Sequence, residues 1–170
     1  MSAEPTLRIL IVEDESLIAL ELESLLLDDG HEPIGVAATA REAAALGERE
    51  PDLALVDVHL ADGPTGIDVA RRLRRNGRTV VLFMTANVKR IPEDFAGACG
   101  VIAKPYTEPG VRNAVRFVAR CRATGQVGSP PSSLTLSPHG PDCLAGCEPR
   151  RLPDDFDAKT PSREGVRRQA

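Results

Sequence analysis

Acidic, basic and hydroxyl side chains in this sequence stand directly after short apolar runs. Glu13 and Asp14 follow the first run, Asp57 ends a later one, and Thr85 and Lys104 stand at the ends of two more. Two carboxylates near 4 Å repel by roughly 4 kcal/mol at an effective dielectric constant of about 20, so a cation must offset them. Lys104 can neutralise one carboxylate, and oxygen ligands suit Mg2+. These residue types predict a magnesium site with room for phosphate oxygens and water.

The apolar runs are typical of buried parallel strands, and they alternate with helical patterns. The expected strands cover 7–12, 33–37, 53–58, 79–84 and 100–103, and the expected helices cover 16–29, 40–49, 65–75, 88–98 and 107–122. Right-handed crossovers favour a parallel sheet with helices on both faces, and ligands bind at the carboxyl ends of its strands. The sequence therefore predicts a doubly wound, five-stranded α/β domain whose polar residues meet on one rim.

Local signals define several of these helices. Thr39 with Glu42 predicts a capping box, and Thr107 predicts another N-cap. Pro92 interrupts the fourth helical segment, which we expect to be short or irregular. Three further leucines widen the apolar face of the first helix and predict that it is well buried. These leucines are Leu17, Leu20 and Leu27.

Residues 7–122 resemble the receiver domain of two-component response regulators, which has a flavodoxin-like fold. The residues that carry the resemblance are Glu13-Asp14, Asp57, Thr85-Ala86 and Lys104-Pro105, each after a predicted strand. Each motif alone is weak, but their order and spacing together are specific. The resemblance covers about two thirds of the chain.

The resemblance implies that Asp57 accepts a phosphoryl group from a histidine kinase or a His-phosphotransfer protein. Asp14 and Asp57, the backbone carbonyl of His59 and, in support, Glu13 would hold Mg2+. The resulting acyl phosphate is open to hydrolysis, so the switch would reset itself. Such a protein is a phosphoacceptor with self-phosphorylation and autodephosphorylation activity, and it is not a conventional turnover enzyme.

The resemblance also implies how the phosphoryl group is held. The Thr85 hydroxyl, the Ala86 amide and the Lys104 ammonium would each bind a phosphoryl oxygen, as in-line transfer requires positioning and charge neutralisation. From position alone, the side chains of His59 and Asn87 are predicted to flank the site and to modulate the lifetime of the phosphoryl group.

One position departs from the family pattern. Receivers often carry Tyr or Phe three residues before the lysine, and that ring turns inward when the threonine moves. This sequence has Val101 there, so it must transmit phosphorylation in another way. Two alternatives stay open: a receiver-like binding module that is not phosphorylated, and an aspartate-nucleophile phosphatase. The phosphatase needs a second acid two residues after Asp57, where this chain has His59.

The totals limit the partners. The net charge of -4 shows no basic excess, which argues against nucleic acid. No targeting or membrane segment is evident, and the four cysteines do not form a disulfide pattern, so a cytoplasmic, reducing location is expected. We expect a monomer or a phosphorylation-dependent dimer. The downstream protein partner cannot be identified from the sequence.

Composition changes near residue 123. Half of the 14 prolines fall in the part that follows, and its apolar period is lost. Ordering such a segment costs roughly 1–2 kcal/mol per residue, which sparse apolar side chains do not offset. Residues 123–170 are therefore predicted to be a disordered tail. Without a second patterned domain, the receiver is expected to act as a single-domain regulator, by protein–protein contact or in a phosphorelay.

Overall fold

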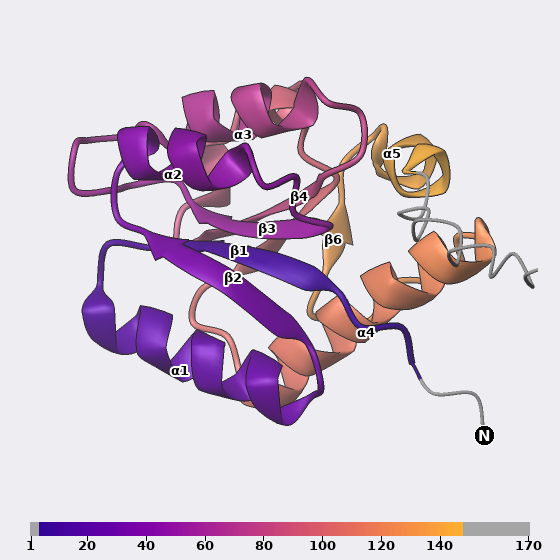
Figure 1. Ribbon diagram of the computed structural model, residues 1–170. Helices are drawn as coiled ribbons and strands as arrows, with labels where there is room; N and C mark the ends of the chain where they lie inside the picture. Colours follow the sequence, from indigo (N-terminus) through magenta and orange to yellow (C-terminus); the bar gives the residue numbers. More distant parts are fainter. Residues whose placement is uncertain (1–3, 148–170) are drawn as a thin grey trace, which may run out of the picture.

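The computed structural model describes residues 4–147 and places helices on both faces of a central sheet (Figure 1). The strands are β1 (Arg8–Val12), β2 (Glu32–Ala37), β3 (Leu53–Asp57), β4 (Val80–Thr85), β5 (Gly100–Ala103) and β6 (Thr135–Leu136). The α-helices are α1 (Ser16–Asp28), α2 (Ala40–Gly47), α3 (Gly66–Arg74), α4 (Glu108–Thr124) and α5 (Gly140–Gly146). Two 3-10 turns, η1 (Val88–Arg90) and η2 (Phe95–Gly97), lie between β4 and β5.

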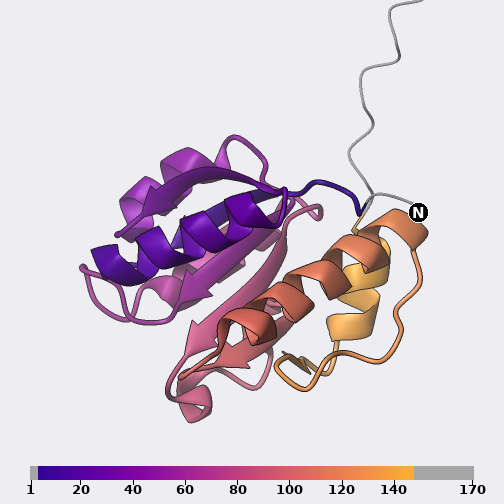
Figure 2. The ribbon, with the colours of Figure 1, turned by 90° about the horizontal axis from the view of Figure 1, so that it is seen from below.

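The sheet has the order β2-β1-β3-β4-β5-β6, and its first five strands are parallel. This confirms the doubly wound α/β fold expected from the sequence. Helices α2 and α3 cover one face, and α1 and α4 cover the other (Figure 1). Viewed from below, α1 and α4 lie side by side, with α5 beyond α4 (Figure 2). The carboxyl ends of the parallel strands therefore share one rim.

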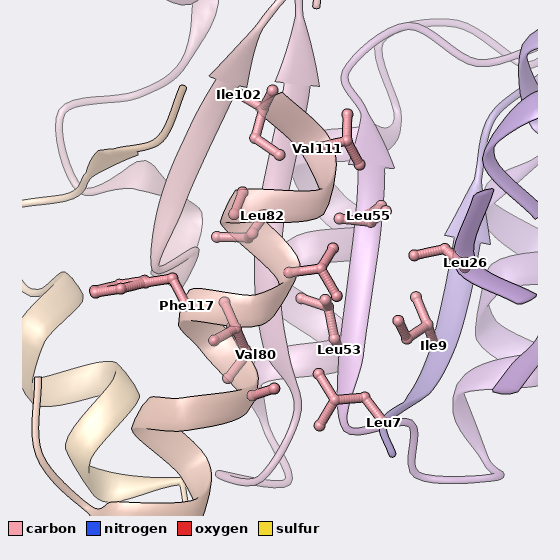
Figure 3. Close-up of a cluster of buried hydrophobic side chains, with 14 of the residues drawn as sticks. Leu7, Ile9, Leu26, Leu53, Leu55, Val80, Leu82, Ile102, Val111 and Phe117 are labelled. Atoms are coloured by element: carbon pink, nitrogen blue, oxygen red, sulfur yellow. The ribbon is translucent and has the colours of Figure 1, made fainter. Parts of the chain in front are cut away.

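The core has one layer on each side of the sheet, because successive strand residues point to opposite faces. In β3, Leu53 and Leu55 point toward α1 and α4, whereas Ala54 and Val56 point toward α2 and α3. Figure 3 shows the first layer, in which Leu26 and Val111 from the helices lie near the strand side chains, whereas the Phe117 ring of α4 points away from Leu53 and Val80. Burial on both faces explains why the strands are continuous apolar runs.

Both predicted N-caps are present. The Thr39 hydroxyl accepts a hydrogen bond from the Glu42 amide at 3.2 Å, and the Thr107 hydroxyl accepts one from the Gly110 amide at 3.1 Å. The Glu42 carboxylate accepts from the amide of Ala38, one residue before the cap, at 2.7 Å. These bonds fix where α2 and α4 begin.

The expected burial of all leucines in α1 is wrong. Leu17, Leu20 and Leu27 are 69%, 62% and 56% exposed. Helix α1 packs on the sheet and on α4 through a narrower stripe, which leaves these three leucines on its solvent side. The buried residues of α1 are Ala19, Leu22, Leu25 and Leu26.

The fourth expected helix, 88–98, does not form an α-helix. Only the two short 3-10 turns are present there. Phe95 and Ala96 have φ values of 52° and 51°, in the left-handed region that an α-helix excludes. The Asp94 carboxylate accepts from the Ala96 amide at 3.0 Å and closes the second turn. The described residues still contain five α-helices, because α5 forms in the segment that the sequence predicted to be disordered.

The prediction of disorder from residue 123 onward is wrong for residues 123–147, which contain regular secondary structure. Helix α4 continues to Thr124, and β6 then pairs antiparallel with β5. Leu134 and Leu144 are 3% and 0% exposed, so two well-placed leucines anchor a segment that shows no periodicity. A Cβ on Gly100 would lie 2.7 Å from the Thr135 carbonyl oxygen, so this glycine allows the close approach. Residues 148–170 lie outside the described residues.

The cysteines also differ from expectation, because Cys99 and Cys143 form a disulfide. It joins the start of β5 to α5 across a separation of 44 residues. Cys121 and Cys147 are free and buried. Spacing could not reveal this pair, since only the fold brings α5 beside β5. Across residues 4–147, no helix is long and apolar enough to cross a membrane.

Candidate functional site

The chemistry-bearing residues meet at the carboxyl rim because neighbouring strands end at matching heights. In the strand register Val12 pairs with Val56, just before the acidic residues of both strands. Asp57 pairs with Met84, and Thr85 pairs with Ala103, which precedes Lys104. The parallel sheet thus brings together residues that are far apart in the sequence.

An acidic cluster forms the centre of the rim. One carboxylate oxygen from each of Glu13, Asp14 and Asp57 lies within 4.8 Å of the others. Glu13 is buried, Asp57 is half-buried and Asp14 is exposed, and a cleft of about 250 Å³ borders Glu13 and Asp14. Three clustered oxygen donors fit a hard divalent cation such as Mg2+, which binds through one or two carboxylates and completes its shell with water.

Lys104 crosses the rim to the acidic cluster. Its Nζ donates to Asp57 Oδ2 at 2.9 Å and to Glu13 Oε2 at 3.1 Å. Its side chain is 18% exposed, so both ion pairs are largely shielded from water. One ammonium balances only one of the three carboxylates, and the remaining negative charge favours a cation.

Burial and pairing shift two pKa values in the site. Burial raises the pKa of the Glu13 carboxyl, although the Glu15 amide and Lys104 oppose this through hydrogen bonds. Burial opposes the charged form of Lys104, but its hydrogen bonds to Asp57 and Glu13 outweigh that effect and raise its pKa. Lys104 is therefore a permanent positive charge at neutral pH.

Thr85 and its neighbours form the opposite wall. Thr85 is 3% exposed, and its hydroxyl oxygen accepts from the Asn87 amide at 3.2 Å. Ala86 and Asn87 are exposed, so both predicted contributors lie at the mouth of the site. This turn holds the hydroxyl at the end of β4, beside the strand that carries Asp57.

His59 contacts two parts of the site. Its backbone amide donates to Asp57 Oδ1 at 3.2 Å, and its imidazole Nε2 lies 3.0 Å from Nη1 of Arg90. Sequence reasoning missed Arg90, which stands in η1. In the sequence, Arg90 stands out only as a basic residue shortly after Thr85. Basic residues are common on protein surfaces, so this position alone does not indicate a site.

Gly66 is a second residue that the sequence analysis missed. A Cβ built on it would lie 2.0 Å from the Asp57 carbonyl oxygen and 2.8 Å from the Val58 Cα. Its amide donates to the Val58 carbonyl at 3.1 Å. The first residue of α3 therefore supports the backbone behind Asp57, and only the absence of a side chain permits this contact.

This combination of fold and rim defines a doubly wound α/β domain with an acidic cluster and a lysine at the carboxyl ends of its strands, and comparison with known proteins identifies the family. Residues 9–116 match the response regulator receiver domain. The chain belongs to this family, whose members are receivers of signalling systems. Both the resemblance and the flavodoxin-like fold inferred from the sequence are confirmed.

Three similar proteins illustrate the match. The phyllosphere-induced regulator PhyR of Methylorubrum extorquens is 38% identical over 114 residues, which cover 65% of this chain and 43% of PhyR. The transcriptional regulatory protein PdtaR of Mycobacterium tuberculosis is 34% identical over 104 residues, covering 59% of this chain and 50% of PdtaR. The solution structure of the Erythrobacter litoralis PhyR receiver domain is 33% identical, with a TM-score of 0.59, and the match covers 77% of this chain and 99% of that one. The chain thus spans about half of these two curated relatives.

Proposed function

We propose that this chain acts as a response-regulator receiver in which Asp57 accepts a phosphoryl group. The observation that carries the proposal is the Asp57 carboxylate, held between the Lys104 ammonium and the His59 amide beside two further acids. An Asp57 oxygen attacks the phosphorus of a phosphohistidine, the P–N bond breaks, and the released imidazole takes up a proton. Asp14 and Asp57, with Glu13 in support and the His59 carbonyl, would hold Mg2+, which would neutralise part of the charge at the site.

The remaining rim residues bind the transferred group in this proposal. Thr85 donates its hydroxyl proton to one phosphoryl oxygen, the Ala86 amide binds the same region, and Lys104 binds another oxygen. Transfer of this kind depends on positioning and neutralisation, which the rim provides without a separate catalytic base. The protein is then a phosphoacceptor that resets by hydrolysis, with no conventional turnover.

A histidine kinase or a His-phosphotransfer protein supplies the phosphoryl group in the cytoplasm. The output is protein–protein contact or onward transfer in a phosphorelay. The relatives named above are regulators, and the matched receiver regions support this assignment.

Labelling with a small phosphodonor tests the proposal. The chain is incubated with acetyl phosphate and Mg2+, and intact mass is measured with and without hydroxylamine. We expect a gain of one phosphoryl group that hydroxylamine removes. Asp57→Asn should abolish the gain, whereas Asp68→Asn, at an exposed acid on α3, should retain it. A wild-type chain that takes up no label would contradict the proposal and leave a binding module.

His59 and Asn87 are proposed to modulate how long the phosphoryl group lasts, because both lie at the mouth of the site. The half-life of the labelled chain is compared between the wild type and His59→Ala, and then Asn87→Ala. Equal half-lives in all three would exclude this role.

A further inference from the structure

We propose that Arg90 is a second phosphoryl-binding cation, which His59 holds in reserve until Asp57 is phosphorylated. The inference rests on the proposed function and deepens it. Nη1 of Arg90 lies 3.0 Å from Nε2 of His59, and the amide of the same histidine donates to Asp57 at 3.2 Å. His59 therefore links the Arg90 guanidinium to the phosphoacceptor Asp57, through its side chain on one side and its backbone amide on the other.

The contact has a defined direction. A guanidinium has donors only, so Arg90 donates and His59 Nε2 accepts. Both side chains are exposed, and the acceptor in this contact is a ring nitrogen and not an anionic oxygen. A hydrogen bond between a guanidinium and a phosphoryl oxygen carries charge on both sides and is stronger. Arg90 therefore gains by exchanging the imidazole for a phosphoryl oxygen.

The charge of the rim gives the reason for the exchange. With Mg2+ bound, its two positive charges and the Lys104 ammonium would balance the three carboxylates of Glu13, Asp14 and Asp57. Phosphorylation replaces the single charge of the Asp57 carboxylate with a group that carries about two negative charges. The loaded site then has about one negative charge in excess. Lys104 already donates to both Asp57 and Glu13, so a further cation is needed.

The position of Arg90 turns this exchange into a movement of the chain. Arg90 ends η1, which is held by its amide to the Asn87 carbonyl and by the Ile91 amide to the Val88 carbonyl. Further along, Asp94 is paired with Arg71 of α3 at 3.0 Å. A shift of Arg90 toward Asp57 therefore displaces residues 87–91 while the next turn stays anchored. Because Val101 replaces the usual aromatic residue, this gives phosphorylation another route to the surface.

Binding of beryllofluoride, a mimic of the phosphoryl group, tests the inference on the full chain. Its apparent Kd is measured at saturating Mg2+ for the wild type, Arg90→Ala, Arg90→Lys, His59→Ala and Lys89→Ala. Arg90→Ala should weaken binding about five- to tenfold, the effect of one exposed charge-assisted hydrogen bond. Arg90→Lys should recover part of this loss. His59→Ala should bind as well as the wild type or more tightly, because it frees Arg90.

Lys89→Ala is the matched control, since it removes the neighbouring exposed cation from the same turn. It should stay within twofold of the wild type. Backbone amide NMR provides a second readout: beryllofluoride should shift the signals of Thr85 and Lys104 in both the wild type and Arg90→Ala. The shifts of residues 88–91 should shrink only in Arg90→Ala.

The outcomes separate this inference from the proposed function. Wild-type affinity and unchanged 88–91 shifts in Arg90→Ala would overturn the inference alone. If Lys89→Ala lost as much beryllofluoride affinity as Arg90→Ala, the effect would come from the general charge of the turn, and the inference would be overturned. If His59→Ala lost as much, Arg90 and His59 would support the site together as a structural pair, and the inference would again be overturned. A wild-type chain that neither binds beryllofluoride nor takes up acetyl phosphate would overturn both proposals.

Discussion

The Lys104 ammonium is the counter-charge of two carboxylates of the rim, since it contacts both Asp57 and the buried Glu13. If it is replaced by methionine, the carboxylates lose their fixed counter-charge and the phosphoryl group loses a donor. We expect Lys104→Met to lower the rate of labelling by acetyl phosphate roughly a hundredfold, the usual effect of removing one preorganised donor. Lys89→Met serves as the control, and its rate should match the wild type. Wild-type labelling of Lys104→Met would contradict the assigned role.

His31 gives the fold a dependence on pH away from the site. Its Nδ1 accepts from the Leu7 amide at 3.2 Å, and its buried Nε2 has no hydrogen-bond partner among the described residues. Burial lowers the pKa of His31 from its ordinary value of 6.5. The unfolded chain therefore takes up a proton first as the pH falls, so stability is full above about 6.5 and declines below it.

Urea denaturation checks this expectation. The free energy of unfolding should fall more steeply between pH 7.5 and 5.5, chosen at roughly one unit either side of the ordinary histidine pKa, in the wild type than in His31→Gln. The glutamine can still accept from the Leu7 amide but does not titrate. Parallel profiles for the two proteins would show that other groups cause the pH dependence.

At the scale of elements, the contact between α3 and the end of β3 sets the backbone of Asp57. Gly66→Ala places a Cβ 2.0 Å from the Asp57 carbonyl oxygen, so the strand end or the helix must move. We expect this change to cost about 1–3 kcal/mol of stability, as overpacking does, and to slow acetyl phosphate labelling. Thermal or urea unfolding and labelling rates are measured together.

Gly128→Ala is the control for added bulk, because a Cβ there meets no atom within 4 Å. Its stability should stay within about 0.5 kcal/mol of the wild type. If Gly66→Ala behaved like this control in both measurements, the support of Asp57 by α3 would be excluded.

The β4–β5 connection shows why one element could not be predicted in detail. Pro92 indicated an irregular helix, but the left-handed conformations of Phe95 and Ala96 had no sequence signal. Ala96 is 1% exposed and belongs to the core layer under α3. The local helical pattern does not show which side chains of this connection join the core, since that depends on how α3 packs against it.

At the scale of the whole molecule, the segment that follows α4 extends the receiver. It adds β6 to the edge of β5, packs α5 on α4, and is joined to β5 by the Cys99–Cys143 disulfide. A crosslink across 44 residues restricts the unfolded chain, which stabilises the fold by typically about 2–4 kcal/mol.

Cys143→Ser should therefore lower the free energy of unfolding by about 2–4 kcal/mol in oxidising buffer. In excess dithiothreitol, the wild type and the variant should unfold at nearly the same urea concentration, which provides the control. A difference that persists unchanged under reduction would show that the serine acts through packing and not through loss of the crosslink.

The sequence by itself determined the alternation of strands and helices, the parallel sheet and the meeting of Glu13, Asp14, Asp57, Thr85 and Lys104 at one rim. Hydrophobic periodicity identifies the strands and helices locally. Because the strands are parallel, the residues that follow them lie at the same edge of the sheet. The roles of the rim residues in phosphoryl transfer stay predictions.

Only the tertiary structure decided the remaining features: the exposed leucines of α1, the 3-10 turns, the Arg90–His59 contact, the space at Gly66, and the ordered segment with its disulfide. Each depends on which surfaces meet after folding. Leu134 and Leu144 carry no periodic signal, yet both are buried because glycines let their segment approach β5 closely. Pairings of this kind are set by long-range packing, which one sequence does not encode as a local pattern.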